Sequence, residues 1–170
     1  MALFGSSRDA SLLRRLNREF LGDIINQQCA YYKYNLEKTK VNVYGEVQGG
    51  KRFFLDPVLF NCLVTKGDQE NPSDAMGVDF ARSMDFAFLK DDMIDSNVVA
   101  EVGDIIMYYE GYFEVYNVIN NQLWTGKDPQ YPYAANPLNP GLENFGYNVS
   151  VICKTHYVST DKVDIVKSRL

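Results

Sequence analysis

The 170-residue sequence contains one histidine and three cysteines, and this scarcity excludes several kinds of active site. With His156 alone, a single chain supplies neither a serine–histidine–aspartate triad nor a zinc site built from several histidines. Cys29, Cys62 and Cys153 form no CxxC motif, and their odd number predicts no disulfide framework. Cys153 and His156 lie three residues apart in a predicted strand, so their side chains point to opposite faces and cannot pair. We expect three reduced, mostly buried thiols.

Long apolar runs are also missing. No run approaches the roughly 18 consecutive apolar residues that span a bilayer, and the opening MALFGSSRD lacks the apolar stretch of a secretory signal. We therefore expect a protein that stays in the cell that makes it and does not use a membrane. Glycine-rich phosphate-binding motifs and the GxSxG nucleophile motif are absent as well, so we expect no cofactor.

Positive charge is scarce outside the N-terminal segment. Residues 1–18 hold four arginines against one aspartate, which is +3, so the formal net charge of −5 leaves −8 on the remaining 152 residues. An acidic body argues against sequence-independent binding of nucleic acid, because that binding depends on Lys and Arg. A basic segment on an acidic body fits docking to another protein, while a solvated helix face explains the same charges.

Residues 7–28 predict an amphipathic helix or arm, with large apolar side chains at steps of four residues and arginines on the other side. Such a helix either covers one end of the fold or projects from it, and the sequence leaves both open. The apolar positions are Leu12, Leu16, Phe20 and Ile24, and the basic positions are Arg14, Arg15 and Arg18.

Residues 30–158 show the alternation and turn residues of an antiparallel β protein. Long loops are expected at 65–79 and at 125–147, where four of the six prolines lie, and a C-terminal tail at 159–170. On the strand predicted at 57–65, PVLFNCLVT, we expect Leu59, Cys62 or Leu63 to point inward. The predicted fold class is mainly β, a single domain built as a small antiparallel β-barrel or sandwich with an N-terminal amphipathic α-helix and long loops.

The segment EVGDIIMYYEGYFEVYNVINNQLW, residues 101–124, predicts a hairpin with a two-residue loop at Glu110 and Gly111, in which the glycine can take the positive φ of the turn. That loop places Tyr109 opposite Tyr112, and both faces of the hairpin are then apolar. One apolar face can pack in the protein core, and the other needs a second surface to pack against. The face without an obvious partner carries Ile105, Met107, Tyr109, Tyr112 and Tyr116.

Two groups of carboxylates are candidates for metal binding or catalysis. Asp91, Asp92 and Asp95 match no metal-binding spacing, and capping of a short helical turn explains them better. The carboxylates near the hairpin, Glu101, Asp104 and Glu114, show no sign of a catalytic pair, so we assign no catalytic residue and no metal.

Several segments resemble the neck proteins of contractile-tailed, T-even-type bacteriophages, which act as head-closure or stopper proteins. The similar segments are LLRRLNREFLGDII, LEKTKVNVYGE, FLDPVLFNCLVTKGDQE, EVGDIIMYYEGYFEVYNVINNQ and NVSVICKTHYVS. The resemblance extends over most of the chain, between residues 12 and 159, and residues 125–147 carry none of it.

The resemblance implies a structural, non-enzymatic protein that is made in the bacterial host cytoplasm and located in the virion neck. It implies a ring, usually a hexamer, between the portal or head–tail adaptor protein and the tail terminator protein, which retains packaged DNA. DNA would pass through the channel without sequence-specific binding, past an acidic surface that repels it. The second hairpin face is then a candidate subunit interface, unless a helix or loop of the same chain covers it, and the arginine face of the helix a candidate docking site for the adaptor.

A soluble β-barrel module that binds a peptide or a nucleic acid through its long aromatic loop is the alternative function. Aromatic side chains for base stacking are plentiful, but the positively charged groove that accompanies them in such proteins is missing.

Overall fold

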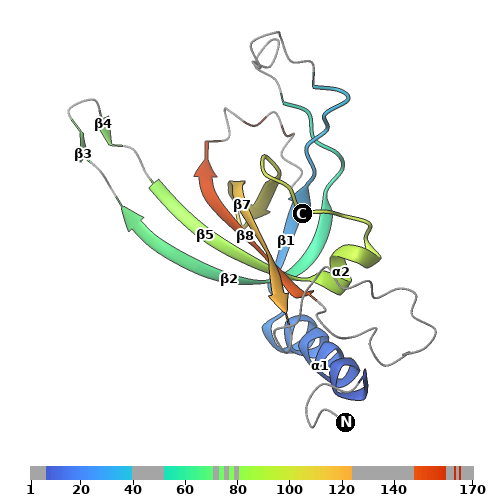
Figure 1. The fold of residues 1–170 in the computed structure, drawn as a ribbon. Coiled ribbons are helices and arrows are strands. Elements are labelled where there is room, and N and C mark those ends of the chain that lie inside the picture. Colours follow the sequence, from blue (N-terminus) through green and yellow to red (C-terminus); the bar gives the residue numbers. More distant parts are fainter. Residues whose placement is uncertain are drawn as a thin grey trace.

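The computed structural model describes residues 7–39, 52–70, 73–74, 77–78, 81–123, 148–159, 163 and 165. Within these ranges the fold is mainly β with an N-terminal helix, as predicted (Figure 1). Its elements are α1 (Ser7–Glu19), η1 (Phe20–Ile25), β1 (Gln28–Tyr32), β2 (Val58–Glu70), β3 (Ser73–Asp74), β4 (Gly77–Val78), β5 (Ala81–Leu89), α2 (Lys90–Asp95), β6 (Ile105–Tyr108), β7 (Gly111–Leu123) and β8 (Asn148–Val158).

Six strands close into an antiparallel barrel in the order β1, β2, β5, β8, β7 and β6. The barrel closes between β1 and β6, where Tyr31 pairs with Ile106. Closure satisfies the backbone groups that an open sheet would expose along its edges. Of the two predicted architectures, barrel and sandwich, the barrel is the one observed.

The barrel interior is filled by alternate residues of its strands. Met84, Phe86 and Phe88 of β5 point inward, as their period of two predicts. On β2, Phe60 and Cys62 point inward and Leu59 and Leu63 point outward, so of the three inward positions considered on this strand only Cys62 is confirmed.

The three cysteines are free and buried in this same core, which confirms the predicted reduced thiols. A hydrogen bond between the thiols of Cys29 and Cys62, together with burial, raises the pKa of Cys29 well above its usual value. Burial also raises the pKa of the Cys153 thiol to about 12. Buried, protonated thiols of this kind behave as small apolar core residues rather than nucleophiles.

The hairpin of β6 and β7 turns one residue earlier than predicted. Tyr109 and Glu110 form the loop, so Tyr112 lies opposite Met107 and not opposite Tyr109 as predicted. Tyr109 takes the positive φ of 52° that we had expected Gly111 to supply. Gly111 instead leaves room for the ring of Phe113, because a Cβ at this position would lie 3.1 Å from that ring and the ring would have to shift by a few tenths of an ångström.

The segment 65–79 is not a simple loop. Strand β2 continues to Glu70, β5 resumes at Ala81, and β3 pairs with β4 between them, so the two barrel strands extend into an arm that projects from the barrel (Figure 1). The polar composition of the segment suggested a loop, but a solvated hairpin needs only its ladder of backbone hydrogen bonds and no apolar face.

Candidate interaction surfaces

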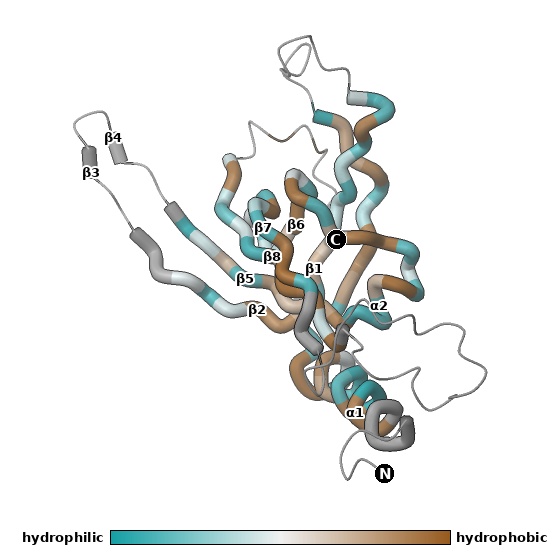
Figure 2. Tube along the Cα trace, in the orientation of Figure 1, coloured by the Kyte–Doolittle hydropathy of each residue, from teal (hydrophilic) through white to brown (hydrophobic). Residues whose placement is uncertain are grey.

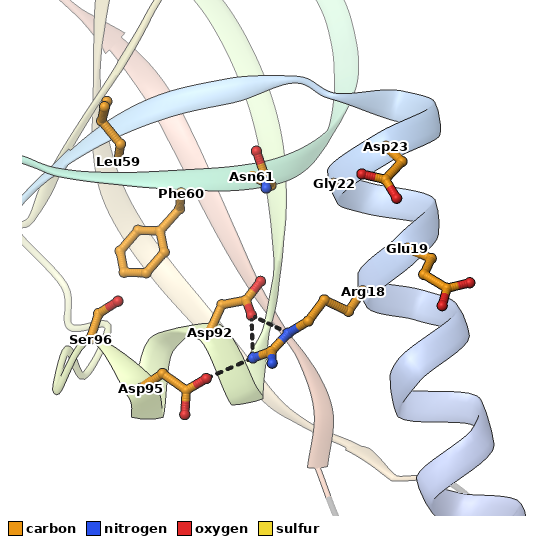
Figure 3. A pocket seen from close by; sticks show the side chains of 10 residues that line it. All are labelled: Arg18, Glu19, Gly22, Asp23, Leu59, Phe60, Asn61, Asp92, Asp95 and Ser96. Carbon is orange, nitrogen blue, oxygen red and sulfur yellow. Dashed lines mark hydrogen bonds and ion pairs between the residues drawn. The ribbon is translucent and has the colours of Figure 1, made fainter.

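The N-terminal helix is attached to the rest of the chain through its basic face. Arg14 donates two hydrogen bonds of 2.7 Å to the two carboxylate oxygens of Asp91 on α2. Arg18 donates to Asp92 at 2.8 and 3.0 Å and to Asp95 at 2.7 Å (Figure 3). Hydrogen bonds to Asp95 and Asp92 raise the pKa of Arg18 above its ordinary value. Two-pronged contacts of this type fix orientation as well as position.

These ion pairs change the interpretation of the aspartates on α2 and of the arginines on α1. Asp91 and Asp92 lie in the first turn of α2, but the residue that caps this helix is Leu89, without a side-chain cap, so the aspartates serve mainly as partners of arginines. The proposed docking of the arginine face to an adaptor needs correction, because Arg14 and Arg18 are bound to α2 of their own chain. Arg15 is exposed and remains available to a partner.

With its basic side against α2, the helix turns its apolar side outward. The four large residues of this side have exposed fractions between 39% and 70%. Figure 2 shows hydrophobic and hydrophilic residues alternating along α1. An amphipathic helix normally buries its apolar side, so this arrangement is the reverse of the usual one. We call the residues Leu12, Leu16, Phe20 and Ile24 the apolar stripe.

A pocket of about 410 Å³ lies between η1, β2 and α2 (Figure 3). Leu59 and Phe60 form part of its wall, while Glu19, Asp23, Asp92 and Asp95 give it an acidic character that Arg18 offsets only in part. This charge makes the pocket unsuitable for phosphate groups.

The second hairpin face is largely covered by the chain itself. Ile105 and Tyr112 are buried, at 1% and 2% exposure, and they pack with Val163 of the C-terminal tail. Phe54 and Ile165 pack against the same cluster. The expected subunit interface therefore does not include these two residues, because a folded partner cannot reach them.

The other three residues of that face differ in how exposed they are. Met107 is partly buried beside the same cluster, and the hydroxyl of Tyr32 donates to its sulfur at 3.9 Å. Tyr109 and Tyr116 are exposed, at 78% and 50%. Tyr116 lies on β7 with its ring 6.0 Å from that of His156, while Tyr109 lies at the hairpin tip.

At the hairpin tip, an aromatic pocket of about 490 Å³ opens at one end of the barrel. The rings of Tyr108 and Tyr109 stand 4.5 Å apart edge-on, and those of Phe113 and Tyr157 stand 5.9 Å apart. Burial, followed by a hydrogen bond to Tyr109, raises the pKa of Tyr108 to about 12. The sequence alone does not predict this pocket, although aromatic residues cluster around the turn. Its lining is Arg82, Met84, Tyr108, Tyr109, Glu110, Gly111, Phe113 and Tyr157.

The carboxylates near the hairpin all have structural partners. Asp104 is fully buried and accepts a hydrogen bond of 2.5 Å from Tyr31, and it shares Lys33 with the exposed Glu101. Glu114 pairs separately with Arg52. Among the described residues, no cluster of three or more His, Cys, Asp or Glu side chains has the arrangement of a metal site. The described ranges also contain no helix with the length and apolar character needed to cross a membrane.

Neither a protein-family model nor a curated protein sequence matches the chain.

Charge reversal of the helix arginines gives a direct test of how α1 is attached. In the variant Arg14→Glu/Arg18→Glu, like charges would face α2, so we expect α1 to separate from it. Hydrogen exchange at residues 12–19 should become at least tenfold faster, while the free energy of unfolding of the barrel changes by less than about 1 kcal/mol. Arg15→Glu is the matched control and should leave the exchange unchanged. Unchanged protection in the double variant would mean that other contacts hold the helix.

Proposed function

We propose that the chain is a structural subunit of a bacteriophage neck, forming a head-closure ring between the portal or adaptor and the tail terminator. The observation that carries this proposal is the outward apolar stripe of α1. A monomer rarely leaves a patch of this kind in water, and larger exposed apolar patches mark surfaces that meet another protein. An assembly subunit gives the stripe a partner.

The size of the stripe supports assembly rather than a chance exposure. Four large side chains with roughly half of their surface in solvent leave about 400 Å² of apolar area, which is the size of a functional patch. A stable interface buries about 800 Å² on each partner, so the stripe would form the centre of a larger contact. In a closed ring each subunit has two such contacts, one on each flank.

The resemblance to neck proteins points the same way, because the similar segments form both the barrel and the exposed helix. LLRRLNREFLGDII includes the apolar stripe and the arginines that orient it, and EVGDIIMYYEGYFEVYNVINNQ forms the hairpin that closes the barrel. An acidic protein of net charge −5 also suits a channel through which DNA slides without being held.

A soluble binding module is the second candidate function, and one observation favours it. The aromatic pocket lies in the mouth of the barrel, where small barrels commonly bind ligands, and peptides bind to pockets lined in this way. The two functions are compatible if the ligand is a segment of a neighbouring subunit.

Loss of the protein during infection tests the proposed function. A phage with an early stop codon in this gene should produce heads that fill with DNA and then lose it, together with separate, finished tails. Electron microscopy of the lysate gives the count of joined particles, which we expect to fall by at least a hundredfold. Expression of the intact protein from a plasmid is the control and should restore joined particles. Normal particle yield without the protein would refute a head-closure role.

A further inference from the structure

The aromatic pocket at the barrel mouth has the features of a site for a proline-rich peptide. Its walls include two pairs of rings, Tyr108 with Tyr109 and Phe113 with Tyr157. In each pair the first ring is buried in the barrel and the second is exposed to a ligand. Proline-rich segments in the polyproline II conformation dock into grooves lined by aromatic side chains, because the extended helix loses little entropy on binding. In that helix, prolines three residues apart lie on the same edge, about 9 Å from each other.

The chain itself contains a segment that meets this requirement. Residues 129–132 read PQYP, with prolines three residues apart, and Lys127 and Asp128 precede them. The pocket carries a matching pair of charges, since Arg82 and Glu110 line it and both are exposed. Asp128 can therefore pair with Arg82 and Lys127 with Glu110, which adds charge complementarity to the aromatic contact.

Covalent geometry argues against the pocket of the same chain as the partner of this segment. Pro129 lies six residues beyond Leu123, the last residue of β7, so it can be at most about 21 Å from the end of that strand. Phe113 lies ten residues before Leu123 on β7, which is about 33 Å along the strand. The reach of the segment falls well short of this length, which favours another copy as its partner.

We propose that the aromatic pocket binds the PQYP segment of a neighbouring copy of this chain, a contact that rests on the proposed ring. The pocket and the segment's attachment point lie at opposite ends of β7. A contact between two different surfaces of identical subunits is heterologous, and heterologous contacts are those that close into rings. The segment of each subunit then occupies the mouth of the next barrel.

A peptide-binding experiment tests this contact without requiring a ring. A fluorescein-labelled peptide of residues 125–135 would be titrated with the full-length protein carrying Pro129→Ala and Pro132→Ala, so that the protein's own segment does not compete. We expect saturable binding by fluorescence anisotropy. A peptide in which both prolines are alanine should bind at least tenfold more weakly.

Variants of the protein then locate the site. Tyr109→Asn keeps a residue that tolerates positive φ and should weaken binding about tenfold, and Arg82→Glu gives a second variant on a different wall. Tyr116→Ala removes another exposed tyrosine, one outside the pocket, and should bind the peptide normally. Absence of binding at millimolar protein, or equal binding by the Tyr109→Asn and Arg82→Glu proteins, would overturn the proposal. That failure is distinct from failure of the neck function, which is judged by infection and by the content of particles.

Discussion

Replacing Leu16 and Phe20 by glutamate is expected to abolish assembly while leaving the barrel folded. Each buried large side chain contributes about 1.5–3 kcal/mol to an interface, so the loss of two, with two carboxylates added, should weaken association by at least about a thousandfold. Both residues are exposed in the monomer, which is why the fold should tolerate the change. Incorporation into particles during infection, with the variant as the only copy, measures the effect.

The control for this experiment is Leu36→Glu. Leu36 is 69% exposed and lies in the turn after β1, away from the helix. It tests whether any added carboxylate on an exposed leucine disturbs the protein, and we expect normal incorporation. Normal incorporation of the Leu16→Glu/Phe20→Glu protein would show that the apolar stripe is not an assembly surface.

Removal of the Asp104 carboxylate is expected to be the most damaging single change to the fold. Its Oδ2 accepts hydrogen bonds from the Tyr31 hydroxyl, the Lys33 ammonium and the Glu101 backbone N–H, and its Oδ1 accepts one from the backbone N–H of Tyr34. Asp104 directly precedes β6, and Tyr31 lies in β1, so the carboxylate joins the two strands where the barrel closes.

Asp104→Ala should lower the free energy of unfolding by about 3–5 kcal/mol, because it leaves the buried Tyr31 hydroxyl and the backbone N–H groups of Tyr34 and Glu101 without their acceptor. Urea denaturation followed by circular dichroism measures the change. Glu101→Ala is the matched control, since Glu101 binds the same lysine from a side chain that is 61% exposed, and it should cost less than about 1 kcal/mol. Equal effects of the two substitutions would contradict this role for Asp104.

Much of the fold followed from alternation and from the spacing of turn residues. The helix, the strand with Met84, Phe86 and Phe88, and the last strand are where the sequence predicts them, because period and burial agree there. The hairpin turn was misplaced by one residue because we assumed that glycine supplies positive φ, whereas Gly111 leaves room for a ring.

The interaction surfaces were harder to predict because they depend on contacts distant in sequence. Arg14 and Asp91 are 77 residues apart, and nothing local shows that the basic face of the helix would turn inward. Amphipathic helices usually bury the apolar side, so the sequence pattern alone suggests the opposite orientation. The sequence also did not predict that the C-terminal tail covers the second hairpin face. Val163 and Ile165, which pack on that face, stand in a segment of mixed charge that shows no apolar pattern. The predictions for Arg15, Tyr109 and Tyr116 as partner contacts stay untested.

The most direct test of the proposed neck function is the number of copies of this chain in a virus particle. Quantitative mass spectrometry of purified particles, with labelled peptides from this chain and from the portal protein as standards, gives the ratio of the two proteins. We predict about six copies per particle, the number expected for one ring that continues the axis of the portal. Absence of the chain from particles, with the protein abundant in infected cells, would contradict the account and favour a soluble binding module.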